Sequence, residues 1–524
     1  MDNWGESMNI SKMSHVMSAD FLTHHLSAVL TAGLTAILLV LFGLTRIKDV
    51  SSKKLVRPPG PSGIPLLGNL LTVAFSKLYQ HELVNQWSKK YGDVFWFKIF
   101  GTGVVIINDM DVVQKTFQNT EVCDRAPFFA LDHVIGRENN GIAFANGGSW
   151  KEQRKFFVSV FRKVDIGVSR LEDIVSDQVR NIVTQVKNLK GEKFDPAIMV
   201  NMSIANIITR IITGVTYKWE DKKFQHIVAC SGKLFDISGP AGLFSLNPVF
   251  ARLPLPVNYE IRRLTLAIVD FIHESIDEHR KHFKSDPNAK AKDYIGAYLK
   301  EMAGADANTL KSFDDTNLVV SCFDALLAGW ETVASTLRWT IYLLSTNPEA
   351  QERMRHEIHD LVGSERFPTI ADRQHLPLTE ATIAECMRFI PAVPIHLPHV
   401  TSQDCKIGGF DVPKGSAVAA NLHHFAKSPT LWEDPDVFRP ERFLDDEGKF
   451  KRGMEPIPFG YGKRQCPGEQ LARMEMFIFT TFLVQNFDLR LPAGAKADLQ
   501  GVLGLTWRPN HYFIEGRPIN FNEE

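Results

Sequence analysis

The sequence predicts a mainly α-helical protein of the α+β class, in which small β-sheets accompany one large helical domain. Its 524 residues are 44 % hydrophobic and carry a net charge of -1, so the chain can bury a large core. Apolar residues recur at helical spacing through most of the chain, and strand-like patterns are confined to two short regions. The near-neutral charge gives no electrostatic reason to expect nucleic acid as a partner.

The first expected element is a membrane anchor. Residues 26–45 carry no charge, and as a helix they would span about 30 Å of hydrocarbon. Basic residues follow this segment and a weakly acidic flank precedes it, so the positive-inside rule places the remainder in the cytoplasm. A cleaved signal peptide is the alternative, but its apolar core would be shorter and would end in a small-residue cleavage site. We therefore predict a lumenal N-terminus over residues 1–25, with a sequon at Asn9, and a single-pass signal anchor over 26–45.

Residues 46–70 are basic at first and then rich in proline and glycine, which favours stiff extended backbone and disfavours helix. This composition predicts a hinge between the membrane and the body of the protein. No obvious linker divides the rest, so residues 71–524 are expected to form a single domain.

Within that domain, Val94–Phe100 and Val104–Asn108 flank a Gly-Thr-Gly turn, which predicts a β-hairpin. A second β-rich region is expected around Lys406–Val418. The clearest amphipathic helices are predicted at Trp150–Arg162, Leu171–Leu189, Val257–Phe283 and Pro348–Val362.

One further helix, Thr316–Leu344, is apolar on nearly every face, which is typical of a helix that crosses a protein interior. Its middle nevertheless contains Gly329, Glu331 and Thr332, which are costly choices for a dry core. We expect a functional need for polarity and room at this point.

Cys466 lies in the stretch PFGYGKRQCPGEQLARMEMFIF, where a loop of glycines and cations leads into an amphipathic helix. A structural cysteine is the simplest interpretation, but the glycines would let backbone N–H groups converge on the sulfur. Arg464 and the helix N-terminus would lower the pKa of the thiol. No nearby histidine suggests a nucleophile, so a metal ligand is the better functional hypothesis. The six cysteines are scattered without a C-x-x-C pair, which favours reduced thiols over disulfides or a zinc site.

The loop also fits a family signature. Phe459, Gly462, Arg464, Cys466 and Gly468 fill the pattern F-x-x-G-x-R-x-C-x-G of the cytochrome P-450 haem-thiolate monooxygenases, and the chain resembles that family along nearly its whole length. The resemblance implies a haem b cofactor held between the long central helix and the helix after the Cys loop. It implies that Cys466 is the axial ligand, whose sulfur pushes electron density to the iron and favours O–O cleavage.

Two further motifs match the family in order. Glu385 and Arg388, one helical turn apart, together with Arg442 in FRPERF resemble the family's buried Glu-Arg-Arg triad, which implies a structural role. A Glu-Arg pair at this spacing would otherwise be a solvated surface pair.

The second motif is AGWET, which resembles the family's oxygen-activating groove. Ala328 would leave space beside the haem, the Thr332 hydroxyl would relay protons or bond the Ala328 carbonyl, and Glu331 would help supply protons. A back-bonded core hydroxyl is the plain alternative for Thr332. Val333 and Leu327 depart from the usual pattern, and Leu327 is expected to narrow the groove.

The haem carboxylates need donors. Trp150 and Arg154 fit the family's W-x-x-x-R, and Arg464 and His399 occupy positions with the same implied role. Phe459 and Ala328 complete the residues that the resemblance assigns to the cofactor.

The predicted enzyme is a monooxygenase that inserts one oxygen atom of O2 into a lipophilic small molecule, such as a steroid, a fatty acid or a xenobiotic. The resemblance to microsomal relatives implies the endoplasmic reticulum membrane, an NADPH-dependent flavoprotein reductase as electron donor and a b-type cytochrome as a second candidate partner. Pocket walls are expected at Pro127–Phe144, Phe235–Leu255 and Leu503–Trp507. A basic docking face is expected from Lys151, Lys155, Lys163, Arg452 and Lys463.

Two other functions stay open at this point. One is a haem-thiolate isomerase or dehydratase that needs no reductase, and the other is a membrane haem-binding sensor. The Glu331–Thr332 pair favours oxygen activation over the isomerase or dehydratase, and a sensor would need no proton relay. A zinc-protease box is rejected, because His273 and His279 are six residues apart and would point in different directions from a helix. Both are expected on a solvated face.

Overall fold

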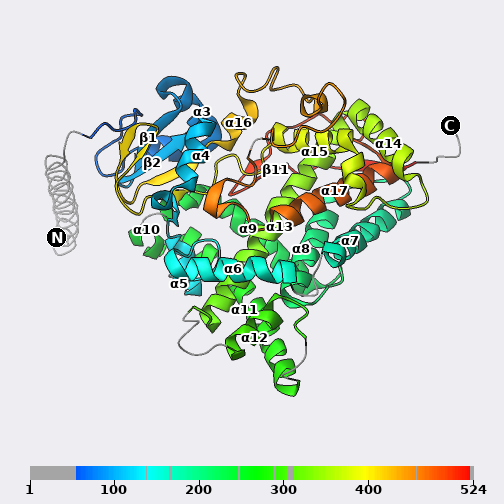
Figure 1. Ribbon diagram of the computed structural model, residues 1–524, viewed down its shortest axis with the longest axis horizontal. Helices are drawn as coiled ribbons and strands as arrows, with labels where there is room; N and C mark the ends of the chain where they lie inside the picture. The colour runs from blue at the N-terminus through cyan, green and yellow to red at the C-terminus, as the bar shows by residue number, and fades with distance from the viewer. Residues whose placement is uncertain are drawn as a thin grey trace, which may run out of the picture.

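The computed structural model describes residues 55–136, 139–163, 168–245, 248–286, 290–304, 312–455 and 457–519. The predicted anchor at 26–45, the segment before it and the sequon at Asn9 lie outside these residues, as does the first part of the predicted hinge. Figure 1 shows β1 and β2 at one end of the molecule, β11 near the middle and helices forming most of the rest, with α13 and α17 also near the middle.

Helices dominate the fold, which confirms the predicted class. Their bounds are α2 (Leu70–Ala74), α3 (Gln80–Tyr91), α4 (Met110–Gln118), α5 (Phe129–Ile135), α6 (Gly147–Lys163), α7 (Val168–Asn188), α8 (Pro196–Thr213), α9 (Lys222–Ser245), α10 (Pro248–Arg252), α11 (Pro256–Ser285), α12 (Tyr294–Gly304), α13 (Asp315–Thr346), α14 (Pro348–Val362), α15 (Pro377–Phe389), α16 (Leu422–Lys427) and α17 (Glu469–Asn486). The four amphipathic runs read from the sequence correspond to α6, α7, α11 and α14.

The largest sheet has the strand order β1-β2-β8-β5-β3. Its strands are β1 (Val94–Ile99), β2 (Thr102–Ile107), β8 (Ala417–Ala420), β5 (His399–Val400) and β3 (Asp124–Arg125). The predicted hairpin is β1–β2, in which Val94 pairs with Ile107. The short strands β3 and β5 pair Arg125 with His399, and this register brings two distant parts of the chain to the functional site.

Three smaller sheets complete the fold. They are β6 (Cys405–Ile407) with β7 (Phe410–Val412), β10 (Val502–Leu503) with β11 (Trp507–Arg508), and β4 (Lys193–Phe194) with β12 (Ile514–Pro518) and β9 (Phe487–Arg490). The second β-rich region of the sequence is therefore β6, β7 and β8.

The described end of the predicted hinge is attached to the body. The Val56 N–H donates to the Asp411 carboxylate at 2.9 Å, and the Asp411 N–H donates to the Val56 carbonyl at 2.8 Å. The Trp96 N–H donates to the Pro59 carbonyl at 2.9 Å, next to β1. Extended backbone in this segment thus pairs with strand edges.

The central helix α13 crosses the interior as expected, because nearly all of its side chains are buried. Gly329 has a packing reason rather than the functional one that we expected. A Cβ at this position would lie 2.8 Å from Cγ1 of Ile208 in α8, so the glycine permits close helix contact. Helices α8 and α13 are both apolar and long enough to span a bilayer, but most of each is buried inside the protein, which accounts for this composition.

Candidate active site

The loop before α17 is shaped by glycines with left-handed backbone. Gly462 has φ +78°, and a Cβ there would lie 2.2 Å from the Phe117 carbonyl oxygen. Gly460 has φ +74°, and its Cβ would lie 2.6 Å from Nε2 of His396. Only glycine fits both the conformation and the space. The Cys466 N–H donates to the Phe459 carbonyl at 2.9 Å and closes the turn.

Cys466 differs from the other five cysteines, because all of those are buried and its own thiol is exposed. It borders open space, although protein surrounds the base of the loop. Burial raises the pKa of the Cys466 thiol, whereas the Gly468 N–H and the Arg154 charge lower it. The net shift is upward, contrary to our expectation, because the burial effect is larger and Arg464 is directed elsewhere. A bound cation is therefore what would hold the thiolate form at neutral pH.

The central helix opens toward solvent-accessible space at one point. Ala328 is exposed although the residues around it in α13 are mostly buried. The Thr332 hydroxyl donates to the Ala328 carbonyl at 2.6 Å, so the two residues lie on one face. Leu327 and Val333 are both buried in hydrophobic clusters.

Glu331 is directed toward α9. Its carboxylate accepts a hydrogen bond from the Ser335 hydroxyl at 3.1 Å, and a Cβ on Gly232 of α9 would lie 3.5 Å from Oε2. Burial raises the pKa of this carboxyl, and the charge of Arg338 lowers it, with a net upward shift. A raised pKa lets this carboxyl keep its proton to higher pH than an ordinary glutamate does.

Arg464 is buried beside Trp150. Its Nε donates to the Cys123 carbonyl at 2.8 Å, and Nη2 donates to the Ala145 carbonyl at 2.6 Å and the Asn146 side chain at 2.9 Å. The guanidinium lies 3.7 Å from the Trp150 ring centre. Burial lowers the pKa of Arg464 to about 10.

Arg125 joins this group, and our sequence analysis missed it. Its Nη1 donates to the Leu397 and Pro398 carbonyls, and its backbone N–H donates to the Asn146 side chain at 2.8 Å. Burial, and then the charges of Arg464 and Arg154, lower the pKa of Arg125 to about 9. An arginine in a two-residue strand has no pattern that marks it as buried, so only the register of β3 with β5 reveals it.

His399 and Arg154 border the same cluster. The His399 Nδ1 is 2.7 Å from the Val122 carbonyl, and its ring stacks on Phe117 with centres 4.3 Å apart. Burial, followed by the nearby Arg125 charge, lowers the pKa of His399, so this ring is neutral. Arg154 is half-buried and donates to the Gln465 carbonyl next to Cys466.

These residues present nitrogens that lack partners. Buried Nε of Arg125, Nε1 of Trp150 and Nη1 of Arg464 are N–H donors without a hydrogen-bond partner. Nε2 of His399 has none either, but in the neutral ring, whose Nδ1–H faces the Val122 carbonyl, it is an acceptor. Among the described residues, none of the three arginines forms an ion pair with a carboxylate. Buried cations and N–H groups are costly unless they are satisfied, so the cluster fits an anionic group with several acceptors. The two carboxylates of haem have this chemistry, and the nearby thiol would supply an iron ligand.

Comparison with known proteins decides the family, because residues 58–515 match the model of the cytochrome P450 family. The chain belongs to the cytochrome P450 family. It is 34 % identical over 462 residues to cytochrome P450 2D27 of Mesocricetus auratus, covering 87 % of this chain and 91 % of that protein. It is 33 % identical over 460 residues to cytochrome P450 2J2 of Homo sapiens, covering 86 % and 89 % respectively. The protein is therefore a monooxygenase of the haem-thiolate class, as the sequence signature implied.

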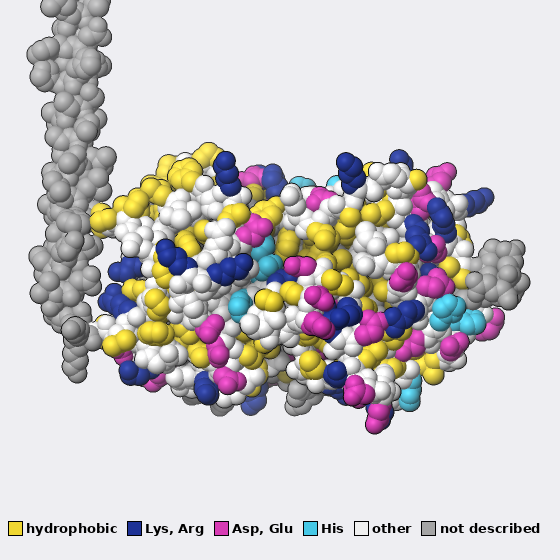
Figure 2. Space-filling view, turned by 90° about the horizontal axis from the view of Figure 1, so that it is seen from above, with side chains coloured by type: hydrophobic (Ala, Val, Ile, Leu, Met, Phe, Trp, Pro, Cys, Tyr) yellow, Lys and Arg dark blue, Asp and Glu magenta, His cyan; other side chains and the backbone are white. Residues whose placement is uncertain are grey.

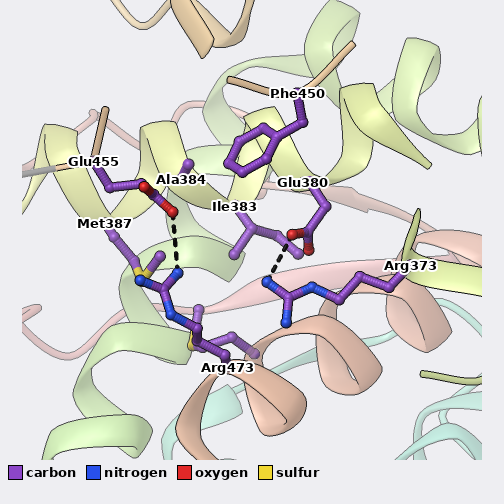
Figure 3. A pocket seen from close by; sticks show the side chains of 9 residues that line it. Arg373, Glu380, Ile383, Ala384, Met387, Phe450, Glu455 and Arg473 are labelled. Carbon is purple, nitrogen blue, oxygen red and sulfur yellow. Dashed lines mark hydrogen bonds and ion pairs between the residues drawn. The ribbon is translucent and has the colours of Figure 1, made fainter. Parts of the chain in front are cut away.

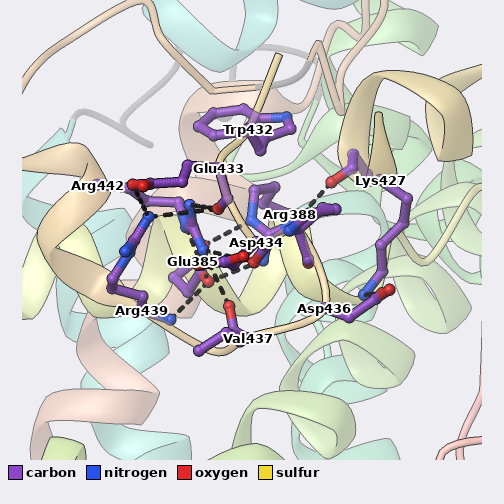
Figure 4. A network of polar contacts seen from close by, with 12 residues as sticks. Glu385, Arg388, Lys427, Trp432, Glu433, Asp434, Asp436, Val437, Arg439 and Arg442 are labelled. Atoms are coloured by element: carbon purple, nitrogen blue, oxygen red, sulfur yellow. Dashed lines mark hydrogen bonds and ion pairs between the residues drawn. The ribbon is translucent and has the colours of Figure 1, made fainter. Parts of the chain in front are cut away.

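The P450 triad residues are in contact (Figure 4). Glu385 and Arg388 are fully buried in α15, and Arg388 donates to both carboxylate oxygens, at 2.6 and 2.8 Å. Arg442, in a short 3-10 helix over Pro440–Phe443, donates to Glu385 at 3.2 Å. Its other nitrogens donate to the carbonyls of Glu433, Asp434 and Val437. The arrangement cross-links α15 to the loop that precedes the Cys loop.

A small pocket is lined by side chains of α15, α17 and nearby loops, and Figure 3 shows these side chains. Arg473 donates to Glu455 at 3.2 Å and to Glu469 at 2.9 Å, and its guanidinium lies 4.9 Å from the Phe459 ring centre. Two ion pairs line this pocket: Arg473 with Glu455, and Arg373 with Glu380 at 2.6 Å. None of the predicted catalytic or haem-binding residues lines it, so it is separate from the P450 site.

The two histidines of the rejected zinc-protease box, His273 and His279, lie in different surroundings. His273 is exposed, as expected. His279 is not on a fully solvated face, because its Nε2 lies 3.1 Å from the Asp293 carboxylate and its side chain is mostly buried. Within the part of the chain that the structure describes, no cluster of three or more His, Cys, Asp or Glu suits a metal ion.

Proposed function

We propose that Cys466 is the axial ligand of haem b, and that this P450 inserts one oxygen atom of O2 into a lipophilic small molecule. The substrate class is a steroid, a fatty acid or a xenobiotic, and the electrons come from an NADPH-dependent flavoprotein reductase. One observation carries the proposal: an exposed thiol and a cluster of buried, unpartnered nitrogens from four separate segments lie in a single site.

The side chains divide the work. Arg125, Arg154, Arg464 and Trp150 would donate to the haem carboxylates and fix the cofactor's orientation, and His399 would join them once its ring carries a proton on Nε2. Bound haem supplies an iron that activates O2, and the thiolate sulfur increases electron density on that iron. The residues of the loop before Cys466 hold the sulfur in place, because a turn closed by the Cys466 N–H leaves it little freedom.

The central helix α13 leaves room for the substrate and carries the groups that transfer protons. Ala328 leaves room for the substrate and the cofactor, and the Thr332 hydroxyl, now bonded to the Ala328 carbonyl, can rotate to donate a proton. Burial raises the pKa of the Glu331 carboxyl, which suits it to a role in proton delivery. Phe459 packs under Arg473 and steadies the Cys loop.

Reductase docking is assigned to a basic face. Lys151, Lys155, Arg452 and Lys463 are exposed around α6 and the Cys loop, and the side chain of Lys163 lies outside the described residues. A b-type cytochrome with an acidic surface would use the same face. Charge reversal at Lys151 and Lys155 should slow reductase-supported turnover while leaving turnover driven by added peroxide unchanged.

Exposed hydrophobic side chains support the proposed attachment to a membrane. Figure 2 shows hydrophobic side chains gathered at one end of the molecular face that it draws. The exposed hydrophobic residues at the start of the described chain are Leu55, Val56, Ile64, Leu71 and Phe75, of which Phe75 is 81 % exposed. These residues follow the predicted single-pass anchor in the sequence, and exposed apolar side chains there fit contact with the endoplasmic reticulum membrane, with the catalytic domain in the cytoplasm.

The experiment is an optical spectrum of the reduced protein with carbon monoxide, followed by NADPH consumption with added reductase. We expect a strongly red-shifted Soret band and substrate-dependent product. In Cys466→Ser the band should be lost, because an alcohol is a poor iron ligand compared with a thiolate. A normal band and full turnover in that variant would refute the assignment of Cys466.

A further inference from the structure

Helix α9 is fastened to the C-terminal loop, residues 501–508, by an ion pair that joins distant parts of the chain. Arg508 of β11 donates from Nε to Asp236 Oδ1 at 2.9 Å and from Nη2 to Oδ2 at 2.6 Å. The two side chains are 25 % and 33 % exposed. A two-pronged, partly buried pair is stronger and more directional than an ordinary surface ion pair.

The backbones meet directly beside this pair. The Leu505 N–H donates to the Phe235 carbonyl at 3.0 Å. A Cβ on Gly239 would lie 2.3 Å from the carbonyl carbon of Gly504, and a Cβ on Gly504 would lie 2.5 Å from the Phe235 carbonyl oxygen. The two elements are therefore in contact with no side chain between them, so any object placed there must move one of them.

A third element supports the contact. The Tyr79 hydroxyl donates to the Gly501 carbonyl at 2.8 Å, and the Gln80 side chain donates to the Gly239 carbonyl at 3.4 Å. The start of α3 thus touches both the C-terminal loop and α9. This places the loop between two helices, with the Asp236–Arg508 pair as its charged attachment to one of them.

The attachment lies close to the oxygen-activating groove. Gly232, one helical turn before Asp236, faces the Glu331 carboxylate of α13. The charges of Asp236 and Arg508 both act on the Glu331 pKa, and in opposite directions. Helix α9 and the C-terminal loop, both expected pocket walls, therefore meet at the edge of the site.

We propose that Asp236 and Arg508 form a size-selecting latch, which sets the largest substrate that reaches Ala328 and Thr332. The inference deepens the proposed function and rests on it for the identity of the groove. A compact ligand fits with the latch closed. A ligand that extends between α9 and the loop must separate them. Its binding affinity is lower because part of its binding free energy is spent on breaking the Asp236–Arg508 pair.

The first test is independent of haem chemistry. Hydrogen exchange followed by mass spectrometry on the purified full-length holoenzyme reports opening of residues 235–239 and 501–508. We expect Asp236→Asn and Arg508→Lys to raise exchange in both segments by about tenfold, which corresponds to about 1.4 kcal/mol. The charge-swapped double variant, Asp236→Arg with Arg508→Asp, should restore much of the protection. Asp177→Asn is the matched control, because it removes a two-residue surface pair with Arg180 inside α7.

The second test measures selection by size. Optical titration of the holoenzyme with imidazole and with the bulky azole clotrimazole gives two dissociation constants. In Asp236→Asn, clotrimazole should bind about tenfold more tightly while imidazole binding stays unchanged. The swapped variant should return the ratio toward that of the original protein, a rescue that loss of general stability could not produce.

Unchanged exchange in both segments for Asp236→Asn and Arg508→Lys would overturn the latch, and so would an equal change in affinity for both azoles. A failure of the proposed function has a different signature, since the red-shifted carbon monoxide band would then be missing from the unmodified protein.

Discussion

Replacing Arg388 by alanine tests the structural role of the Glu385 network. The Arg388 guanidinium is fully buried, makes two hydrogen bonds to Glu385 and donates to the Ala426 and Pro435 carbonyls at 2.7 and 2.9 Å. Its removal leaves Glu385 with Arg442 and one backbone N–H, and it leaves two carbonyls without this donor. Breaking a buried pair by removing one partner costs about 3–5 kcal/mol, and we expect Arg388→Ala to fall in that range.

The assay is thermal unfolding followed by circular dichroism, with haem content measured in parallel. The unfolding entropy of about 2.1 cal/mol/K per residue gives roughly 1 kcal/mol/K for a domain of about 460 residues, so the midpoint should fall by about 3–5 °C. Arg366→Ala is the control. Arg366 holds Asp372 with the same two-pronged geometry, at 2.7 and 2.8 Å, but it is 49 % exposed. Its loss should cost about 0.2–1 kcal/mol, or up to about 1 °C.

The two pairs share their two-pronged geometry and differ in burial and in the backbone carbonyls that Arg388 also binds, so the comparison tests the buried network as a whole. If Arg388→Ala melted within about 1 °C of the original protein, or no lower than Arg366→Ala, the reasoning from burial would be wrong. The double variant Glu385→Ala with Arg388→Ala should be less destabilised than the sum of the single variants, because it removes both members of the pair and leaves only Arg442 without its carboxylate.

Four further predictions concern the site and its surroundings. Thr332→Ala should lower product formed per NADPH by about tenfold while leaving the carbon monoxide band intact, and Thr332→Ser should retain coupling, because a hydroxyl is what donates the proton. Gly462→Ala should cost about 3 kcal/mol or more and reduce haem retention, whereas Gly415→Ala should cost about 1–2 kcal/mol, since both have φ near +80° but only Gly462 faces a backbone oxygen at 2.2 Å. Arg125→Gln should lower haem content in the purified protein and accelerate haem transfer to an apoglobin acceptor, and equal transfer rates would count against a role in holding carboxylates. For His279, burial lowers the pKa of the ring, but the Asp293 carboxylate has the larger effect, and the net pKa is raised above 6.5. The stability that the charged His279–Asp293 pair contributes is therefore complete below about pH 6.5 and is lost as the pH rises through the pKa of His279 in the folded protein. Thermal midpoints of His279→Gln and the original protein should converge at alkaline pH.

Local patterns were sufficient for much of the fold. Apolar periodicity placed α6, α7, α11 and α14, and the Gly-Thr-Gly turn placed the β1–β2 hairpin, because these signals act over a few residues. The same holds for Gly460 and Gly462 before Cys466, whose positive φ angles follow from the tight turn that they form. The family signature carried the remainder of the functional prediction.

Contacts between distant segments were beyond such patterns. Arg125 enters the site only because β3 pairs with β5, and Gly329 is explained only by the approach of Ile208 from another helix. The upward pKa shift at Cys466 depends on how much protein surrounds the loop, which no local spacing reports. Our expectation of a lowered pKa used the charge of Arg464, and the structure directs that charge to Cys123, Ala145 and Asn146 instead.

By itself, the sequence determined the helical class, the thiol in its glycine loop and membership of the haem-thiolate family, because each rests on residues close together in the chain. Tertiary structure alone decided which nitrogens gather without partners, where Glu331 points and how Asp236 meets Arg508 across 272 residues. The physical reason is that burial and charge pairing depend on distances in space, and the folded chain sets those distances only after its separate elements have packed.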